Sequence, residues 1–525
     1  MGIKLIDSSL RDGGNVNDWN FGRRVLHGII ENLSEGGIDV IELGYLKNTE
    51  FDNNRNLYNT VAEAKTIIPE KDNNQEYSVM VQEDKWDWKH LEPCDGIIKH
   101  IRVSFHKYDI YEGLELCKLV KKYGYICHCN PINIMGYNDK ELLDLIDKVN
   151  QISPSVFTIV DTFGSMTIDD MKRINSLLQN NLLETVRISA HLHENLGLAY
   201  SLALEFVSYF ENKRDIYIDA SLNGIGRIPG NLCLELIMNY LNREKNAFYN
   251  INYIYDAIDD FIAKIKSEHP WGYAVPYALS AMYNLHRTYP EFLMEKGTLK
   301  TKDIRTILES INPEEKVIFN QKYIQALYDN YQDVNIDDID DIDTLKMLKK
   351  IFKRKKIFIL APGESILHWE NEIVNIIKRH NCIVVSVNFN HDFIPSDYVF
   401  FTNTKRYSYE RKNINKEKLI ITSNLLHQKI PAKYIVNYYK VSNIDGKRTT
   451  DSVLCLLNLL QSAECSKIYI AGFDGFRDKK NHFDVALDNS YHDPSHEIHV
   501  KDILEKHFCN MDLEYVTPTI YNATL

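Results

Sequence analysis

The sequence predicts an α/β protein of more than one domain, with a (β/α)8 barrel (TIM barrel) first and an open, Rossmann-like α/β unit last. Three observations predict this. The 525 residues exceed the roughly 250–300 residues at which a single hydrophobic core stops growing. Short apolar runs alternate with helical stretches through the first half and again after residue 355. Between these two parts, residues 246–332 contain no clear strand pattern.

Eight strand-like runs come first, separated by about 25–40 residues, which is the spacing of a (β/α)8 barrel. The first connecting segment has a helical period, with Val25, Ile29, Ile30 and Leu33 on one face and Gly36 at its end. We therefore expect a barrel over residues 1–245. The runs are Lys4–Asp7, Val40–Leu43, Tyr77–Val81, Ile101–Phe105, Tyr125–Asn130, Val156–Asp161, Arg187–His193 and Ile216–Ser221.

Residues 246–332 are expected to be a helical extension, with the aromatic segment SEHPWGYAVPYALSAMYNLHRTYP (267–290) at its centre. Two roles fit this segment, a cap over the barrel mouth or a contact between subunits. Residues 333–354 are acidic and then basic, a pattern more typical of a solvated linker and helix than of a recognition tail.

Residues 355–525 again combine strands and helices, and we expect an open, mostly parallel sheet. The segment ILAPGESI (359–366) places a tight turn directly after the first strand. The predicted strands are Ile357–Ala361, Ile383–Val387, Tyr398–Thr402, Leu419–Thr422, Tyr434–Tyr438 and Ile468–Phe473.

Composition restricts the class of protein. A net charge of −12 argues against a general nucleic-acid binder, which needs a basic face. No run approaches the roughly 20 apolar residues that span a bilayer, and the first residues do not form a signal peptide. The nine cysteines lack framework spacing, so free thiols are expected. We expect a cytoplasmic homo-oligomer that acts on small molecules.

Polar motifs follow three of the predicted barrel strands, at the end where barrel enzymes carry their active sites. DSSLRDGG (7–14) follows the first strand, and NGIGRIPGN, which ends at Asn231, follows the eighth. On the seventh, SAHLHENLG places His191 and His193 two residues apart, so that both point to one side. A carboxylate and two imidazoles that converge predict a divalent-ion site with open positions.

These three motifs, in this order, resemble the metal-dependent aldolase and lyase superfamily that includes 3-hydroxy-3-methylglutaryl-CoA lyase, 4-hydroxy-2-oxovalerate aldolase and 2-isopropylmalate synthase. The resemblance covers about residues 1–290. It implies that Asp12, His191 and His193 hold Mg²⁺ or Mn²⁺. It also implies that Asn231 completes or supports this ligand set.

The chemistry expected at such a site makes or breaks a C–C bond next to a carbonyl, through an enolate. A chelated ion stabilises that charge as a Lewis acid. Arg11 can place its planar guanidinium on the enolate oxygen. Asp161 and Thr162, from DTFGSM, and Arg102 are the predicted substrate-binding residues.

The sequence departs from this family at the position of the base. The 4-hydroxy-2-oxo acid aldolases carry His where this chain has Asn15, and Asn is no base at neutral pH. The base must then lie elsewhere or be a water held by the ion. The candidate side chains are His106, His128 and a tyrosine of the aromatic segment (Tyr273, Tyr277 or Tyr289), of which we select Tyr277.

No acyl-CoA feature is evident, and the mobile cysteine of the lyases has no counterpart in NGIGRIPGN. An aldolase or lyase acting on a 2-oxo acid such as pyruvate is therefore preferred to a Claisen-type synthase that uses acyl-CoA. A third alternative, suggested by Asn15, is a metal-binding scaffold that has lost its base.

The last unit resembles domains related to hydroxymethylpterin pyrophosphokinase and to sialyltransferase-like glycosyltransferases, over about residues 355–500. The resemblance implies a nucleotide-linked ligand, such as a nucleotide sugar for a surface glycan, although a purely structural unit stays open. A turn with Gly363 and Ser365 lets backbone amides approach a phosphate. The other predicted ligand-binding residues lie near the carboxyl ends of strands: Asn388, Asp397, Asp474 and His482.

Overall fold

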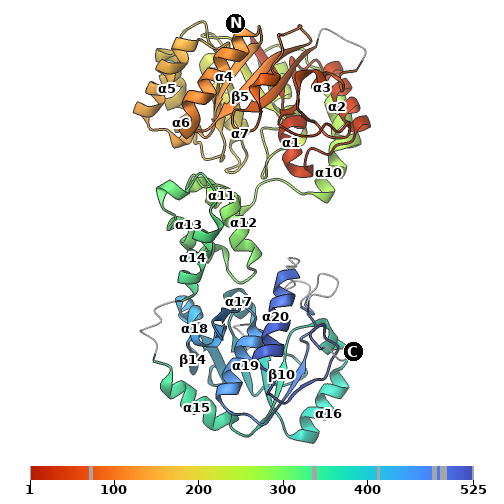
Figure 1. Ribbon diagram of the computed structural model, residues 1–525, viewed down its shortest axis with the longest axis vertical. Helices are drawn as coiled ribbons and strands as arrows, with labels where there is room; N and C mark the ends of the chain where they lie inside the picture. Colours follow the sequence, from red (N-terminus) through yellow and green to blue (C-terminus); the bar gives the residue numbers. More distant parts are fainter. Residues whose placement is uncertain are drawn as a thin grey trace. The chain divides into compact units, whose positions relative to one another are not determined.

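The computed structural model describes residues 2–69, 75–333, 340–410, 414–475, 482–484 and 494–522. The chain divides into two compact units, Met1–Arg287 and Thr288–Leu525, which Figure 1 colours from red to green and from green to blue. Within the predicted linker, residues 334–339 lie outside the described part. The domain boundaries that the sequence suggests at residues 245, 332 and 354 stay predictions.

The first unit is a closed parallel barrel, as predicted. Strand β1 pairs with both β9 and β2, through Ile3↔Ile216 and Ile6↔Val40, and this closes the sheet. A short strand that we did not predict, β3 (Leu57–Tyr58), extends β2 outside the barrel. The barrel strands are β1 (Ile3–Asp7), β2 (Val40–Leu46), β4 (Glu76–Gln82), β5 (Ile98–Phe105), β6 (Ile126–Pro131), β7 (Val156–Asp161), β8 (Arg187–Leu192) and β9 (Ile216–Ala220).

Helices surround the barrel, and the main core lies between them and the strands. In α2 the apolar face of the 3.6-residue period, Leu26, Ile29, Ile30 and Leu33, is completely buried. Inside the barrel a small apolar cluster of Ile6, Val40, Val156 and Tyr217 adjoins polar side chains. The surrounding helices are α2 (Arg23–Glu35), α3 (Val61–Lys65), α4 (Ile110–Lys122), α5 (Asp139–Ile152), α6 (Ile168–Asn181), α7 (Ala199–Phe210) and α8 (Leu234–Glu244).

The motif after β1 folds as a helix, α1 (Ser9–Asn17). The Asp7 carboxylate accepts hydrogen bonds from the backbone N–H and the hydroxyl of Ser9, at 3.0 and 2.7 Å. This bond pattern satisfies one of the amides at the helix start. The first turn of α1 therefore holds Arg11 and Asp12 at the carboxyl end of β1.

The chain from residue 246 to 287 is helical, as expected, and packs on the barrel. It forms α9 (Ile251–Ala257), α10 (Ala263–Glu268) and α11 (Val275–Met282). Trp271 donates its Nε1–H to the carbonyl of Asn223 at 2.9 Å, and Asn284 accepts from Ser165 at 3.1 Å. Because these partners lie in loops after β9 and β7, the segment covers part of the barrel mouth, one of the two roles considered for it.

The second unit contains the predicted open parallel sheet, in the order β14-β13-β12-β11-β10-β17-β18. The strand order changes direction beside β10, because β11 and β17 flank it. We did not predict β18, whose Leu513 and Tyr515 are only partly buried. The strands are β10 (Lys356–Leu360), β11 (Ile383–Val387), β12 (Tyr398–Phe401), β13 (Leu419–Thr422), β14 (Tyr434–Val436), β17 (Lys467–Ala471) and β18 (Leu513–Tyr515), with a separate hairpin of β15 (Asn443–Ile444) and β16 (Lys447–Arg448).

Helices pack on this sheet and on its edge, and the buried side chains of the unit form clusters of their own. In the described part of the whole chain, no helix combines the length and the apolar character needed to cross a membrane. The helices are α12 (Thr288–Glu295), α13 (Thr301–Glu309), α14 (Gln321–Gln332), α15 (Ile342–Phe352), α16 (Glu370–His380), α17 (Thr404–Glu410), α18 (Tyr438–Ser442), α19 (Ser452–Ser462) and α20 (Pro494–His507).

Candidate active site

Three predicted metal ligands converge at the carboxyl end of the barrel. Asp12 comes from α1, His191 from the end of β8 and His193 from the residues after it. The Asp12 Oδ2 atom lies 3.9 Å from His191 Nε2 and 3.6 Å from His193 Nε2. One donor atom from each residue lies within 4.8 Å of the other two, and all three side chains are buried. This is a compact set of one carboxylate and two imidazoles.

Each histidine has a polar contact at Nδ1, and these contacts favour its role as a ligand. His193 Nδ1 lies 2.8 Å from the carbonyl oxygen of Thr162, an acceptor, so this nitrogen carries the proton. His193 Nε2 is buried and has no hydrogen-bond partner among the described residues. His191 Nδ1 likewise contacts the Asp219 carboxylate at 3.0 Å. Both Nε2 atoms lie near Asp12 Oδ2, an arrangement that fits a divalent ion.

Electrostatics keep Asp12 ionised. Burial opposes its charge, but Arg11, His193 and His191 hold the pKa of the Asp12 carboxyl well below its usual range. Burial also lowers the pKa of His191, which favours the neutral imidazole that binds metals. A negative Asp12 carboxylate and a neutral His191 imidazole are protonation states that suit metal binding.

Two asparagines contact Asp12. Asn231, from the glycine-rich loop, donates its Nδ2–H to Asp12 Oδ2 at 2.7 Å, and its own Oδ1 is buried without a partner in the described structure. Asn15 donates to the Asp12 backbone carbonyl at 2.9 Å and to Asp12 Oδ1 at 3.2 Å. Asn231 thus lies where the resemblance places it, and Asn15 supports the carboxylate.

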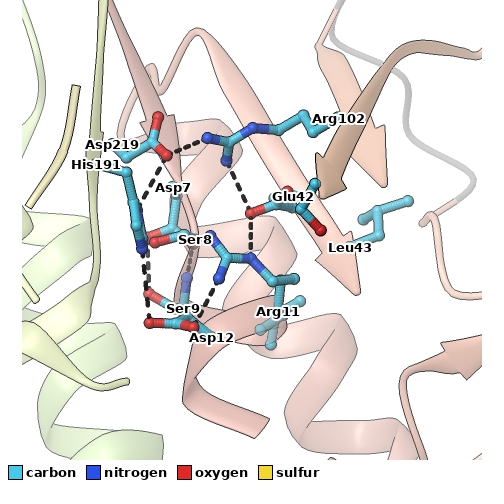
Figure 2. Close-up of polar contacts among 12 residues, drawn as sticks. Asp7, Ser8, Ser9, Arg11, Asp12, Glu42, Leu43, Arg102, His191 and Asp219 are labelled. Carbon is cyan, nitrogen blue, oxygen red and sulfur yellow. Dashed lines mark hydrogen bonds and ion pairs between the residues drawn. The ribbon is translucent and has the colours of Figure 1, made fainter. Parts of the chain in front are cut away.

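A continuous chain of buried ion pairs holds Arg11 in place (Figure 2). Arg11 contacts Asp12 Oδ1 through NH1 at 2.6 Å and Glu42 Oε2 through Nε at 2.8 Å. Glu42 also accepts from Arg102 NH1 at 3.0 Å, and Arg102 pairs with Asp219, which contacts His191. The remaining guanidinium nitrogen of Arg11, NH2, is buried and has no partner among the described residues. Arg11 can therefore offer a donor to a bound oxygen.

Sequence reasoning missed Glu42 and Asp219. Both are completely or almost completely buried inside apolar strands, VIELGYL and IYIDA. A lone acid in such a strand is a usable signal, because buried carboxylates are rare unless they are paired. Arg102, predicted to bind substrate, forms the other half of these pairs and is completely buried.

Asp161 and Thr162 support the site from the loop after β7. The Asp161 carboxylate accepts from the backbone N–H groups of Ser165 and Met166, at 2.9 and 3.3 Å, and burial raises its pKa to about 6. Thr162 positions His193 through its carbonyl and accepts from the backbone N–H of Asn133 at 2.7 Å.

The structure places the three candidate bases as follows. His128, on β6, lies 2.9 Å from His100 in a buried pair, and its ring also contacts Tyr217. His106 follows β5 and stacks on Tyr108, and burial lowers its pKa. Tyr277 lies on α11 and is partly buried. The structure brings Arg11, Asp12 and the histidine ligands together, and it places His128 in a different cluster.

In the second unit, Gly363, Asn388 and Asp474 line a cavity of about 200 Å³ at the carboxyl ends of β10, β11 and β17. Ser365 donates its backbone N–H to Asp474 at 2.8 Å, and Asn388 donates to Ser452 at 2.6 Å. This cavity lies where the strand order changes direction, the usual ligand position of open α/β sheets.

The two other predicted residues lie apart from that cavity. Asp397 directly precedes β12, and it accepts from the backbone N–H of Val384, near the start of β11, at 2.9 Å. It therefore lies at the amino ends of these two strands. His482 is buried and stacks on Phe483.

Comparisons with known proteins find sequences and structures that are similar to this chain. Residues 2–260 match the family model described as HMGL-like. A 2-isopropylmalate synthase of Bacillus velezensis is 25% identical over 337 residues, which cover 59% of this chain and 60% of that protein. A 2-isopropylmalate synthase of Geobacillus sp. (strain WCH70) is 27% identical over 261 residues, 47% of this chain and 49% of that protein. The chain thus spans about half to three fifths of the length of these curated relatives.

A solved structure, the N-terminal domain of an aldolase candidate from Bacteroides vulgatus, aligns with 55% of this chain and 96% of its own, at 24% identity and a TM-score of 0.47. The family match covers the barrel and all of its predicted ligands. Residues 2–260 of this chain thus form a barrel that is similar to the HMGL-like family.

Proposed function

We propose that the barrel is a divalent-metal-dependent enzyme that makes or breaks a C–C bond next to a carbonyl group of a 2-oxo acid such as pyruvate. The observation that carries this proposal is the buried set of Asp12, His191 and His193, with both Nε2 atoms facing one carboxylate. Asp12, His191 and His193 would hold Mn²⁺ or Mg²⁺, with Asn231 beside them. When bound, the ion would act as a Lewis acid on the substrate carbonyl.

Residues of the chain supply the remaining requirements. The Arg11 guanidinium, fixed by Glu42 and Asp12, keeps NH2 available for the oxygen that becomes negative in the enolate. Because the ion pairs through Arg102 and Asp219 fix both Arg11 and His191, this geometry exists before substrate binds. His106 and Tyr277 stay proposed as bases, and Asp161 and Thr162 shape the substrate side through the loop after β7.

A Claisen-type reaction with an acyl-CoA is a comparably supported alternative, because the similar relatives are named 2-isopropylmalate synthase. Both reactions need an enolate and the same ion. They differ in the source of the enolate, which is a 2-oxo acid in one reaction and an acyl-CoA in the other. The scaffold alternative requires that no enolate forms at all.

One experiment separates these three proposals. The Mn²⁺-loaded protein is incubated in D₂O with pyruvate, and loss of the methyl proton signal is followed by NMR. In parallel, acetyl-CoA with a 2-oxo acid is assayed for free thiol. We expect Mn²⁺-dependent exchange on pyruvate. Thiol release without exchange would favour the synthase, and neither reaction would favour the scaffold.

Variants connect this activity to the site. We expect Asp12→Asn and His191→Ala to abolish Mn²⁺ binding and proton exchange, because each removes a ligand. His90→Ala, which changes an exposed histidine of the same unit, serves as the control and should exchange normally. Full exchange by an EDTA-treated, metal-free preparation would contradict the metal proposal.

For the second unit, we propose a nucleotide-linked small molecule, such as a nucleotide sugar, in the cavity beside Gly363, Asn388 and Asp474. Its position at the change in strand order supports this proposal. Titration with UDP-, CMP- and GDP-linked sugars, with Asp474→Ala as the comparison, tests it. Equal heats of binding for Asp474→Ala and the unchanged chain would contradict the proposal.

We also keep the predictions of a cytoplasmic location and of a homo-oligomer. The first agrees with nine cysteines that are all unpaired. Sedimentation of the full chain tests the second.

A further inference from the structure

Asn130 and Thr158 are among the side chains inside the barrel whose polar atoms have no hydrogen-bond partner in the described structure. Asn130, on β6, is 1% exposed, and neither Nδ2 nor Oδ1 has a hydrogen-bond partner among the described residues. Thr158, on β7, is 0% exposed, and its Oγ1 is likewise unpartnered within the described chain. Buried polar groups are almost always hydrogen-bonded, because leaving them unpaired costs their hydration. These atoms therefore need an explanation.

Both side chains face the barrel interior. On β6 the neighbouring thiol of Cys129 interacts with Cys117 of α4, outside the barrel. Because side chains alternate along a strand, Asn130 points inward, like His128, whose ring contacts Tyr217. On β7, Phe157 and Ile159 belong to the outer core and Val156 to the interior cluster. Thr158 shares the inward face with Val156.

The two residues also lie in one row of the sheet, next to the metal-ligand support. Cys129 is in register with Phe157, so Asn130 and Thr158 are neighbours on adjacent strands. Thr158 is in register with Ser189 of β8, whose hydroxyl donates to Asp219 at 3.1 Å. Asp219 in turn contacts His191. Asn130 and Thr158 thus line the barrel interior next to Ser189 and Asp219, and Asp219 contacts the predicted ligand His191.

We propose that Asn130 and Thr158 bind a hydroxyl group of the substrate, so that the barrel takes a hydroxylated acceptor aldehyde or releases one. This inference rests on the proposed function. The Asn130 amide offers hydrogen-bond donors and an acceptor, and the Thr158 hydroxyl both donates and accepts. A substrate hydroxyl, which also donates and accepts, satisfies both side chains. A carboxylate has no proton to donate and would leave the amide oxygen unpaired.

The test compares glyceraldehyde with propionaldehyde, which lacks the hydroxyl groups, as acceptors for pyruvate and Mn²⁺. We expect the unchanged protein to prefer glyceraldehyde in kcat/KM by about 10- to 100-fold, because a site built to hydrogen-bond a hydroxyl rejects the analogue without it. Thr158→Val and Asn130→Ala should each reduce that ratio to below about threefold.

Ser104→Ala is the matched control. Ser104 belongs to the same row on β5, but its hydroxyl already donates to the Val81 carbonyl at 3.1 Å. This variant should keep the preference for glyceraldehyde. Thr158→Val preserves side-chain shape and removes no hydrogen bond of the described structure, so its melting temperature should not fall. Thr158→Val therefore tests the proposal even if Asn130→Ala fails to fold.

Binding is measured separately, so that failure of the proposed function is distinguishable. Broadening of glyceraldehyde and propionaldehyde proton signals by the Mn²⁺-loaded chain reports affinity without turnover. Selective binding of glyceraldehyde that Thr158→Val abolishes supports the inference even if pyruvate does not exchange. Equal affinities for the two aldehydes, or a preference that Thr158→Val leaves unchanged, would show that water alone satisfies these groups and would overturn it.

Discussion

At the residue scale, Asn15 departs from the family pattern described above, and its hydrogen bonds to Asp12 give it a structural role. The Asn15 amide donates to the Asp12 carbonyl and to Asp12 Oδ1, at 2.9 and 3.2 Å. The bond to a charged oxygen orients the carboxylate that would hold the ion. Asn15 therefore supports the predicted metal ligand Asp12 and does not serve as a base.

We accordingly expect Asn15→Ala to weaken Mn²⁺ binding by about 10-fold or more, which is typical for the loss of a hydrogen bond that orients a metal ligand. Titration of free Mn²⁺ by its electron paramagnetic resonance signal measures this. Asn17→Ala, two residues further along α1, is the control and should bind normally. An unchanged affinity in Asn15→Ala would show that Asn231 and Arg11 orient Asp12 without help.

At the scale of elements, the buried ion pairs connect strands that are distant in the sequence. Arg102 of β5 contacts Glu42 of β2 and Asp219 of β9, and all three side chains are buried. Arg102→Met should lower the free energy of unfolding of the barrel by about 3–5 kcal/mol, because it leaves buried carboxylates without their partner. Arg173→Met, which removes an exposed ion pair with Asp139, should cost about 1 kcal/mol or less. Denaturant titration compares the two, and equal losses would contradict this view of Arg102.

The buried Asp7, where β1, α1 and β9 meet, predicts that the free energy of unfolding depends on pH. Burial raises the pKa of Asp7 to about 7, although its two bonds from Ser9 oppose this shift, against 3.8 in the unfolded chain. Neutral Asp7 stabilises the fold below pH 4, and this contribution is lost as pH rises through about 7. Between those values the unchanged protein should lose about 1.4 kcal/mol per pH unit relative to Asp7→Asn. Unfolding of both at pH 4.5, 5.5 and 6.5 measures the difference, and a constant difference would contradict the prediction.

The elements also show which parts of the fold a sequence reveals. The eight barrel strands are evident because each contains buried apolar residues in a short run between helical segments. Strand β3 has only two residues, and β18 is partly exposed, so neither contains enough apolar pattern. The three predicted metal-ligand positions follow from motifs at strand ends. Glu42 and Asp219 do not, because their partners Arg11, Arg102 and His191 come close only through the closure of the barrel.

At the scale of the whole molecule, the two units have separate hydrophobic clusters, so each can unfold by itself. Among the residues that the structure describes, the predicted metal site lies in the barrel. A ligand that binds only the folded state stabilises that state by about 2.7 kcal/mol at a concentration of 100 times its Kd. Mn²⁺ should therefore stabilise one unit and leave the other unaffected.

Calorimetry of the full chain can resolve this difference. We expect two transitions, of which Mn²⁺ raises the temperature of one only, and Asp12→Asn should abolish the increase because the ligand set loses its charge. Fluorescence of a probe attached through the exposed Cys509 identifies the transition of the second unit, which should not respond to Mn²⁺. A single transition that Mn²⁺ shifts as a whole would show instead that the two units unfold as one, and a Mn²⁺ effect on the Cys509 probe alone would place the ion in the second unit.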